Sequence, residues 1–280
     1  MGASVAEQVD LNRLRRQVSV DRLLARLFQE ESALWILKGG HALELRFRMA
    51  RSTVDIDLTL AATAESKPDD TSEALREMLQ RAAGIDLQDW FEFTIGPPIM
   101  DLNAAPYGGA RYPIEARMDQ RIFGRFHLDA AIGDVVIQPL ESIVCRDWLG
   151  FAGIEASKVR MTTREQQLAE KIHAYTLPRN STNSQVKDLA DLALLIGSGG
   201  LDEQRARDSL PSHIREAGNT RFAYGVGRAA KDWKLPFRAL AKEYGLPIDV
   251  YVAFAMVQEL WTRSRDGDCQ DSFVPQKRSS

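Results

Sequence analysis

The stretch "LKGGHALELRFRMARSTVDIDLTL", residues 37–60, joins two features that do not help to build a hydrophobic core. It opens on the adjacent glycines Gly39 and Gly40, and it ends on a segment that carries Asp55 and Asp57. That segment alternates between apolar and polar side chains, which indicates a β-strand with one buried and one polar face. Residues i and i+2 of a strand point to the same side, so the two aspartates share the polar face, about 6–7 Å apart.

Two carboxylates this close repel each other unless cations lie between them. Divalent ions with oxygen ligands are natural partners, and a pair of such ions is a common clamp for nucleotidyl displacement. The segment "RFHLDAAIG", residues 125–133, offers a third carboxylate, because its alternation puts Asp129 on the polar face of another strand. The pattern predicts that Asp55, Asp57 and Asp129 hold Mg²⁺ or Mn²⁺. The alternative is that DxD is an ordinary string at strand ends and turns.

The glycines precede a segment with a helical pattern, residues 41–48. Backbone N–H groups at a glycine-rich helix start commonly cradle phosphates, so we expect a metal-bound nucleoside triphosphate (NTP) to bind here. The alternative is that a Gly-Gly pair marks only a turn. Ser52 and Thr53 are expected to cap the turn before the strand, or to be sites of self-modification by the bound nucleotide. The candidate counter-charges for the triphosphate are Lys38, Arg46, Arg48 and Arg51.

The composition is that of a globular protein of 280 residues with 44% hydrophobic residues. The net charge of -3 argues against a protein that coats nucleic acid by bulk electrostatics, but it leaves room for a local basic groove. The chain has no apolar run of about 18 residues and no signal-peptide pattern, so we expect a cytoplasmic protein without a membrane segment. Its two cysteines, far apart in sequence, are expected to be reduced thiols.

The order of hydrophobic patterns predicts an α+β fold. A helical rhythm fills residues 8–30, β-like alternation dominates residues 90–136, and from residue 139 onward the pattern is mostly helical. A Thr162–Glu165 capping box is expected to start one of the later helices. We therefore expect a small mixed β-sheet flanked by an N-terminal helix and a mostly helical C-terminal region. The expected divisions are an N-terminal helical segment at 1–30, an α/β core at 31–145 and a helical domain at 146–280.

Two later helical segments carry charges at positions that call for partners. In "LAEKIHAYTLPR", residues 168–179, Lys171 borders an apolar stripe, which predicts that its ammonium points inward toward a negative group. In "KDLADLALL", residues 187–195, Asp191 lies among apolar residues, an unfavourable place for an unpaired charge. The alternative is an exposed Lys187–Asp191 pair. Asp188 is expected to be solvated.

These segments together resemble the AbiEii/AbiGii toxin family, which includes the mycobacterial MenT toxins and lies within the DNA polymerase β-like nucleotidyltransferase superfamily. The resemblance spans residues 36–196. His41 is a departure, because the superfamily usually has Ser or Thr after the glycines. The family pattern implies a nucleotidyltransferase core in which Lys171 contacts the triphosphate and Asp191 orients a reacting or binding group. Together with the local patterns described above, this gives the following candidate nucleotide-binding residues: Lys38, Gly39, Gly40, His41, Arg51, Ser52, Thr53 and Lys171.

The resemblance also implies a biological role. The chain is expected to be the toxin of a toxin–antitoxin pair that transfers NMP from an NTP to the 3′ end of tRNA and so blocks translation, with a cognate antitoxin as partner. Tyr107, Tyr112 and Trp148 are candidate aromatic contacts for the RNA. Two alternatives stay open. One is transfer to a protein or small molecule by the same site, and the other is a non-catalytic nucleotide-binding regulator.

Overall fold

The computed structural model describes residues 11–30, 33–48, 53, 55–60, 71–102, 106–176, 182–210 and 220–266. The chain divides into two compact units. Unit 1 comprises Met1–Phe47 and Ser52–Thr162, and unit 2 comprises Arg48–Arg51 and Thr163–Ser280. The helix at Leu11–Leu27 and the strand at Lys158–Met161 thus belong to unit 1. The expected divisions put them in the segment at 1–30 and in the helical domain at 146–280.

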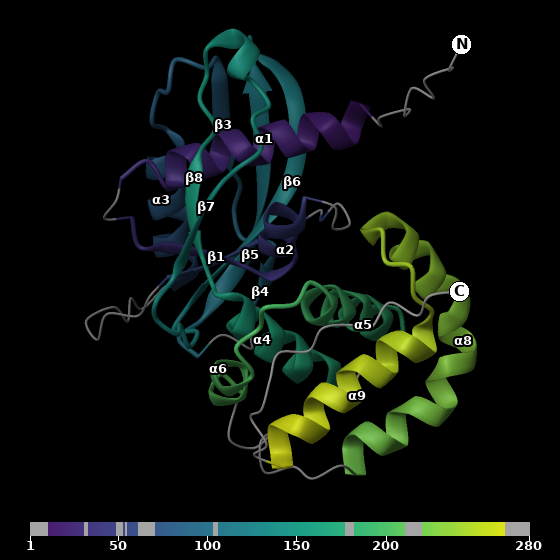
Figure 1. The fold of residues 1–280 in the computed structure, drawn as a ribbon. Coiled ribbons are helices and arrows are strands. Elements are labelled where there is room, and N and C mark those ends of the chain that lie inside the picture. The colour runs from purple at the N-terminus through teal and green to yellow at the C-terminus, as the bar shows by residue number, and fades with distance from the viewer. Residues whose placement is uncertain are drawn as a thin grey trace, which may run out of the picture. The chain divides into compact units, whose positions relative to one another are not determined.

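Unit 1 is built on an eight-stranded sheet within the described residues, with the order β3-β5-β6-β2-β1-β8-β7 and β4 paired to β5 (Figure 1). The sheet is mixed, as predicted, because β2 pairs parallel to β6 and antiparallel to β1, while β1 pairs parallel to β8. The strands are β1 (Trp35–Lys38), β2 (Asp55–Leu60), β3 (Phe91–Ile95), β4 (Met100–Asp101), β5 (Gly109–Met118), β6 (Arg121–Ile132), β7 (Glu141–Val144) and β8 (Lys158–Met161).

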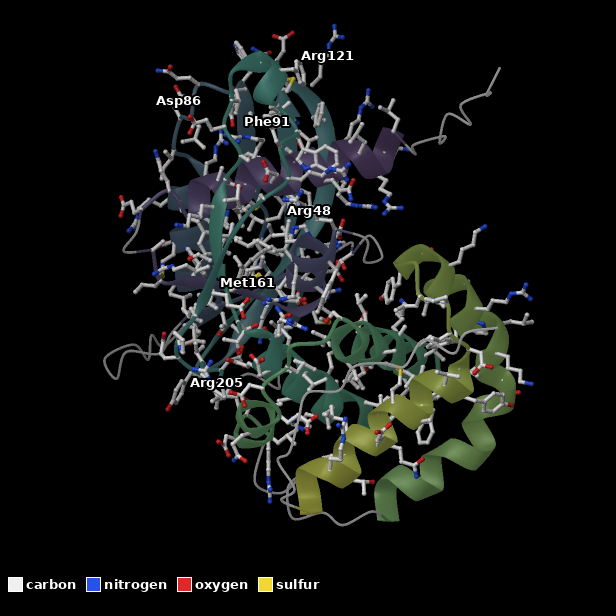
Figure 2. The ribbon with its side chains drawn as sticks, in the orientation of Figure 1. Arg48, Asp86, Phe91, Arg121, Met161 and Arg205 are labelled. Carbon is white, nitrogen blue, oxygen red and sulfur yellow. The ribbon has the colours of Figure 1, made fainter. Side chains whose placement is uncertain are left out.

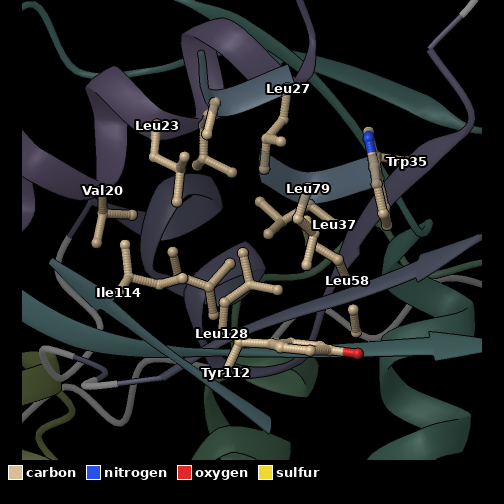
Figure 3. Packing of buried hydrophobic residues seen from close by; sticks show 14 of the residues in the cluster. Val20, Leu23, Leu27, Trp35, Leu37, Leu58, Leu79, Tyr112, Ile114 and Leu128 are labelled. Carbon is tan, nitrogen blue, oxygen red and sulfur yellow. The ribbon is translucent and has the colours of Figure 1, made fainter. Parts of the chain in front are cut away.

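Three helices accompany this sheet: α1 (Leu11–Leu27), α2 (Gly39–Phe47) and α3 (Thr71–Ala83). Helices α1 and α3 contact each other and both contact β3, so they cover the same face, and α1 runs across the strands in Figure 1. Leu23 and Leu79 of these helices pack with Leu58 and Leu128 of β2 and β6 in the buried core (Figure 3). The apolar side of β2 therefore faces the helices, which leaves its aspartates on the other side.

A buried ionic network fastens α1 to the start of β3. Asp89 is 1% exposed and accepts hydrogen bonds from Arg22 at 2.7 Å and from Arg26 at 2.6 and 2.9 Å. Arg26 also donates to the backbone carbonyl of Phe91, a buried residue that is labelled in Figure 2. Asp89, Arg22 and Arg26 are ion-paired and hydrogen-bonded to one another, so their burial is tolerated. The network also fixes the position of the helix on the sheet.

Two predictions about the region after residue 139 were wrong. β7 and β8 form an antiparallel hairpin-like pair at the edge of the sheet, where helices were expected. The next helix begins one residue later than predicted, because the hydroxyl of Thr163, not Thr162, accepts the backbone N–H of Gln166 at 3.2 Å. Glu165 accepts instead from the backbone N–H of Asp202. The sheet therefore extends beyond the expected core.

Within the described residues, all the secondary-structure elements of unit 2 are helices. Its helices are α4 (Arg164–Thr176), α5 (Thr182–Gly197), α6 (Glu203–Asp208), α8 (Thr220–Tyr244) and α9 (Val250–Asp266). Helix α5 contacts α4, α8 and α9, and its buried side chains include Leu189, Leu192 and Leu195. The end of α5 at Gly197 agrees with the sequence. Among the described residues, no helix has the length and apolar content needed to cross a membrane.

Candidate active site

Strand β2 brings the predicted acids of unit 1 together. In the parallel pairing of β2 with β6, Asp57 lies opposite Asp129 and Asp55 lies opposite His127. The Nδ1 atom of His127 is 3.6 Å from Oδ1 of Asp55. Because paired residues on neighbouring strands point to the same face, the three carboxylates form one cluster on the polar face of the sheet.

A basic side chain that the sequence did not suggest enters this cluster from β5. Arg111 lies opposite Asp129 in the β5–β6 pairing and donates to both of its carboxylate oxygens, at 2.7 and 2.8 Å. Its Nη2 atom is also 3.1 Å from Oδ2 of Asp55. The pKa of Arg111 is raised, first by its hydrogen bonding to Asp129 and further by the charges of Asp129, Asp55 and Asp57. Arg111 is therefore a fixed positive charge within the cluster.

This arrangement decides how a divalent ion can fit. Both oxygens of Asp129 are used by a bidentate guanidinium contact, which is among the strongest side-chain interactions. No group of three or more His, Cys, Asp or Glu side chains in the described part of the chain is placed to hold a metal ion. Asp55 and Asp57 supply the other two carboxylates of the cluster, with Asp55 also 3.1 Å from Arg111. Mg²⁺ is commonly held by one or two carboxylates together with substrate phosphates. An ion at this site would therefore be held by Asp55 and Asp57, while Asp129 is bound by Arg111.

The diglycine lies directly beside these acids. Lys38 pairs with Asp57 across β1 and β2, and α2 begins at the next residue, Gly39, with a φ of +68°. A Cβ atom at Gly39 would lie 2.0 Å from Oδ2 of Asp57, so only glycine leaves room for this carboxylate. The start of α2 therefore lies against Asp57, and the first turn of a helix leaves backbone N–H groups that can bind an anion.

The side chains around the helix start are engaged within unit 1. Lys38 forms an ion pair with Asp134. His41 is buried, and its Nδ1 atom is 3.7 Å from Oε2 of Glu44. Burial by itself raises the pKa of Glu44, but contact with His41 and a hydrogen bond from the backbone N–H of Thr53 outweigh it and leave that pKa below its ordinary value. The imidazole that replaces the usual hydroxyl thus faces a carboxylate.

Other predicted residues differ in their outcome. The hydroxyl of Thr53 is buried, which does not suit a site of self-modification. Tyr112 is fully buried and donates to the backbone carbonyl of Ser72, so the expectation that it contacts RNA was wrong. Arg46 forms an ion pair with Glu141. Arg51 and Ser52 lie outside the described residues.

In unit 2, Lys171 of α4 meets two acids of α5. Its ammonium is 2.7 Å from Oδ2 of Asp191 and 3.2 Å from Oδ1 of Asp188. The ammonium thus points toward negative groups, as the position of Lys171 beside an apolar stripe predicted. Asp188 is 6% exposed, so the expectation that it is solvated was wrong. Lys187 is exposed while Asp191 is buried, which also excludes the alternative of an exposed Lys187–Asp191 pair.

Helix α8 completes this cluster with a residue that sequence reasoning missed. The hydroxyl of Tyr244 donates to Oδ1 of Asp191 at 2.5 Å, and Tyr244 is 1% exposed. Both oxygens of Asp191 are therefore held, one by a cation and one by a phenol. Nearby, burial and then the charge of Asp188 raise the pKa of Tyr175. No pattern in the sequence near Tyr244 pointed to Asp191, which lies 53 positions away.

The comparisons with known proteins agree with this architecture. The family described as "Nucleotidyl transferase AbiEii toxin, Type IV TA system" matches residues 22–263. Among solved structures, MenT4, the nucleotidyltransferase toxin Rv2826c from Mycobacterium tuberculosis H37Rv, aligns with a TM-score of 0.52 and 15% identity, over 91% of this chain and 94% of MenT4. JHP933 from Helicobacter pylori aligns with a TM-score of 0.46 and 13% identity, over 94% of each chain. No curated protein matches the chain.

The two kinds of match carry different weight. At 15% identity, the likeness to MenT4 shows a shared fold and confirms the α+β architecture. The family match extends over most of the 280 residues and includes both acid clusters. The chain therefore belongs to the AbiEii family of nucleotidyltransferase toxins.

Proposed function

We propose that this nucleotidyltransferase transfers NMP from an NTP to the 3′ end of a tRNA, in a reaction that depends on Mg²⁺ or Mn²⁺, and that the modified tRNA no longer supports translation. The observation that carries the proposal is the contact between the start of α2 and Asp57, where a Cβ on Gly39 would lie 2.0 Å from the carboxylate. The helix start that we propose to bind phosphates thus lies against one of the two proposed metal-binding acids.

Each part of this site has a distinct task. The backbone N–H groups of Gly39 and Gly40 bind the phosphates, because the first turn of a helix leaves its N–H groups without intrahelical partners. Asp55 and Asp57 hold the divalent ion. Such an ion, when bound, supplies positive charge that stabilises the negative charge developing on the transferred phosphoryl group.

The cluster also suits the proton transfer that the reaction needs. The hydroxyl at the RNA end attacks the α-phosphorus of the NTP, the bond to pyrophosphate breaks, and the hydroxyl proton passes to a carboxylate of the cluster. Arg111 stays beside Asp55 as a positive charge that favours a polyanionic substrate. Lys171 and Asp191 are proposed to serve the same reaction, on the strength of the family pattern.

Family membership supports the choice of acceptor and partner. The family is described as part of a type IV toxin–antitoxin system, so the expected partner is a cognate antitoxin protein. We take RNA as the acceptor because the family resemblance implies it, and the cytoplasm as the location because tRNA and NTPs are present there. Transfer to protein by the same site is the competing outcome.

A labelling assay tests the proposal. The purified chain is incubated with Mg²⁺ and each of the four α-labelled NTPs in turn, with total tRNA in one arm and total cell protein in the other. We expect at least one NTP to label the 3′ end of tRNA and Asp57→Asn to abolish the label. Asp86→Asn, an exposed aspartate of unit 1, is the matched control and should leave labelling intact. Label confined to protein, or RNA unlabelled with every NTP, would contradict the proposal.

A further inference from the structure

The pair of helices at the end of unit 2 forms a groove that the chemistry above does not use. Helices α8 and α9 pack against each other and are drawn side by side in Figure 1. A groove of about 740 Å³ runs along them and over the connection between them. Its apolar lining includes Phe237, Leu246, Ile248 and Val250. This volume lies within the range of about 300–1,000 Å³ that is typical of ligand-binding clefts.

Three cations line one side of this groove at intervals of one helical turn. Lys234, Arg238 and Lys242 are separated by four residues each, so they lie on the same face of α8, and all three are exposed. Within the described part of the chain, none of the three has a carboxylate partner, and the contact of Lys234 is with the ring of Tyr251. Unpaired cations in a row are suited to a polyanion, in a chain whose net charge is -3.

The acid that lines the groove is already compensated. Asp249 precedes α9, and its Oδ1 atom accepts the backbone N–H groups of Tyr251 at 2.8 Å and Val252 at 3.0 Å. Its negative charge is therefore directed at the positive end of α9, where it caps the helix. The field within the groove is accordingly dominated by the three cations of α8.

An aromatic ring accompanies the cations. Tyr251 is 47% exposed, and the ammonium of Lys234 lies 5.1 Å from the centre of its ring. An exposed ring next to a row of cations is the arrangement by which single-stranded nucleic acid is bound, because bases stack on the ring while phosphates meet the cations. An acidic protein segment would use the cations but would not need the exposed ring.

We propose that the α8–α9 groove binds a single-stranded stretch of the RNA acceptor, with Lys234, Arg238 and Lys242 on its phosphates and Tyr251 stacked on a base. This inference rests on the proposed function in taking RNA as the acceptor. It adds a second RNA-binding region, within unit 2, which increases the affinity for RNA independently of the RNA sequence.

RNA binding without any NTP tests the groove apart from the chemistry. The probe is a fluorescein-labelled oligouridine 12-mer, and its anisotropy is followed against protein concentration at several salt concentrations. The groove variant carries Lys234→Gln, Arg238→Gln and Lys242→Gln. The control carries three other exposed cations changed to Gln, at Arg121, Lys158 and Arg205, of which Arg121 and Arg205 are labelled in Figure 2. Both variants change the net charge by the same amount.

We expect the groove variant to bind the probe at least about tenfold more weakly, and the slope of log K against log salt to fall by about 2, since three phosphate contacts of about 0.7 each are lost. The control variant should bind within about twofold of the parent chain. Tyr251→Ser should weaken binding by about tenfold, with Tyr251→Phe restoring it and Phe151→Ser, at another exposed ring, having no effect.

Two results would overturn the inference. The first is equal weakening by both triple variants, which means that only bulk charge matters. The second is unchanged RNA binding by the groove variant; if the same variant also loses binding of a labelled oligoglutamate peptide, the groove is assigned to an acidic protein. Failure of tRNA labelling by a chain whose groove binds the probe counts against the proposed acceptor and not against the groove.

Discussion

The guanidinium of Arg111 grips both carboxylate oxygens of Asp129, at 2.7 and 2.8 Å, across neighbouring strands of the sheet. The same guanidinium lies 3.1 Å from Asp55. The positively charged side chain of Arg111 therefore already contacts acids that a divalent ion would bind. Its charge opposes metal binding and favours a polyanionic substrate.

Arg111→Gln should therefore tighten the binding of Mn²⁺ in the absence of nucleotide. Removal of a positive charge a few ångströms from Asp55 lowers the repulsion felt by the ion, and we expect an affinity gain of about three- to tenfold. Isothermal titration of Mn²⁺ measures it. The double variant Arg111→Gln with Asp129→Asn keeps the net charge of the cluster and should return to the parent affinity. Weaker Mn²⁺ binding by Arg111→Gln would show that Arg111 supports the ion.

Gly39→Ala should destabilise the site more than its backbone conformation alone explains. Alanine in a left-handed conformation costs about 1–2 kcal/mol at any such position. At Gly39 the new Cβ would also meet Asp57, 2.0 Å away, so Asp57 must move. Gly153 has a similar φ of +76° with nothing within 4 Å, and Gly153→Ala is the matched control.

Urea unfolding and NTP binding of the two glycine variants separate these effects. We expect a similar backbone cost in both, a further loss of unfolding free energy in Gly39→Ala, and weakened NTP binding in Gly39→Ala alone. Equal effects of the two substitutions would mean that the contact between Gly39 and Asp57 has no part in the site.

Asp89→Asn keeps the shape of the side chain but removes its charge, and it should be among the most destabilising substitutions in unit 1. It leaves Arg22 and Arg26 buried without their counter-charge, and loss of one partner of a buried ion pair costs about 3–5 kcal/mol. Asp86→Asn, at an exposed residue three positions earlier, should change the unfolding free energy by less than about 0.5 kcal/mol. Thermal or urea unfolding at neutral pH compares them. A small effect of Asp89→Asn would contradict the role of the network as an anchor of α1.

The same carboxyl predicts a pH dependence. Burial by itself raises the pKa of Asp89, but the hydrogen bonds and charges of Arg26 and Arg22 outweigh it and hold that pKa below its ordinary value of 3.8. Stability from this group is therefore fully present above pH 3.8 and is lost as the pH falls through the folded-state value. The unfolding free energy of the parent chain should drop more steeply with acid below pH 3.8 than that of Asp89→Asn.

Tyr244→Phe should destabilise unit 2 without leaving a large cavity in its core. The substitution removes the hydrogen bond to Asp191 and keeps the ring, so we expect a loss of about 1.5–3 kcal/mol, the range for hydrogen bonds to charged groups. Tyr251→Phe, at an exposed tyrosine of α9, should have little effect on stability. Lys171→Met should lower the unfolding free energy more than Tyr244→Phe does, because it leaves the buried carboxylates of Asp188 and Asp191 without the ammonium that pairs with them. Equal stability of Tyr244→Phe and the parent chain would remove Tyr244 from the cluster.

The sequence predicted the parts of the fold that local pattern determines. The strict alternation of β2 and the apolar stripe of α1 are each visible within a few residues, and both elements were predicted correctly. The strands β7 and β8 were missed, because each is four residues long and β8 is stabilised by its parallel pairing with β1, far away in sequence.

The candidate site shows the same limit. Asp55 and Asp57 were recognisable because their spacing defines a strand face, and Asp191 because its apolar neighbours required a partner. Arg111 and Tyr244 were missed. Nothing near Arg111 reveals that β5 pairs with β6 in the register that meets Asp129, and Tyr244 is 53 positions from Asp191. Partners supplied by long-range packing are not encoded in any short window.

The bond between Tyr244 and Asp191 bears on shortened forms of the gene product. A premature stop codon between the codons for Asp191 and Tyr244 would yield a polypeptide that still contains the diglycine, the acid pair and Lys171. It would lack the phenol that donates to Asp191, together with helix α9 and part or all of α8, which pack against α5. Truncated alleles of this kind should therefore be harmless to the host cell even though every residue of the family signature is translated.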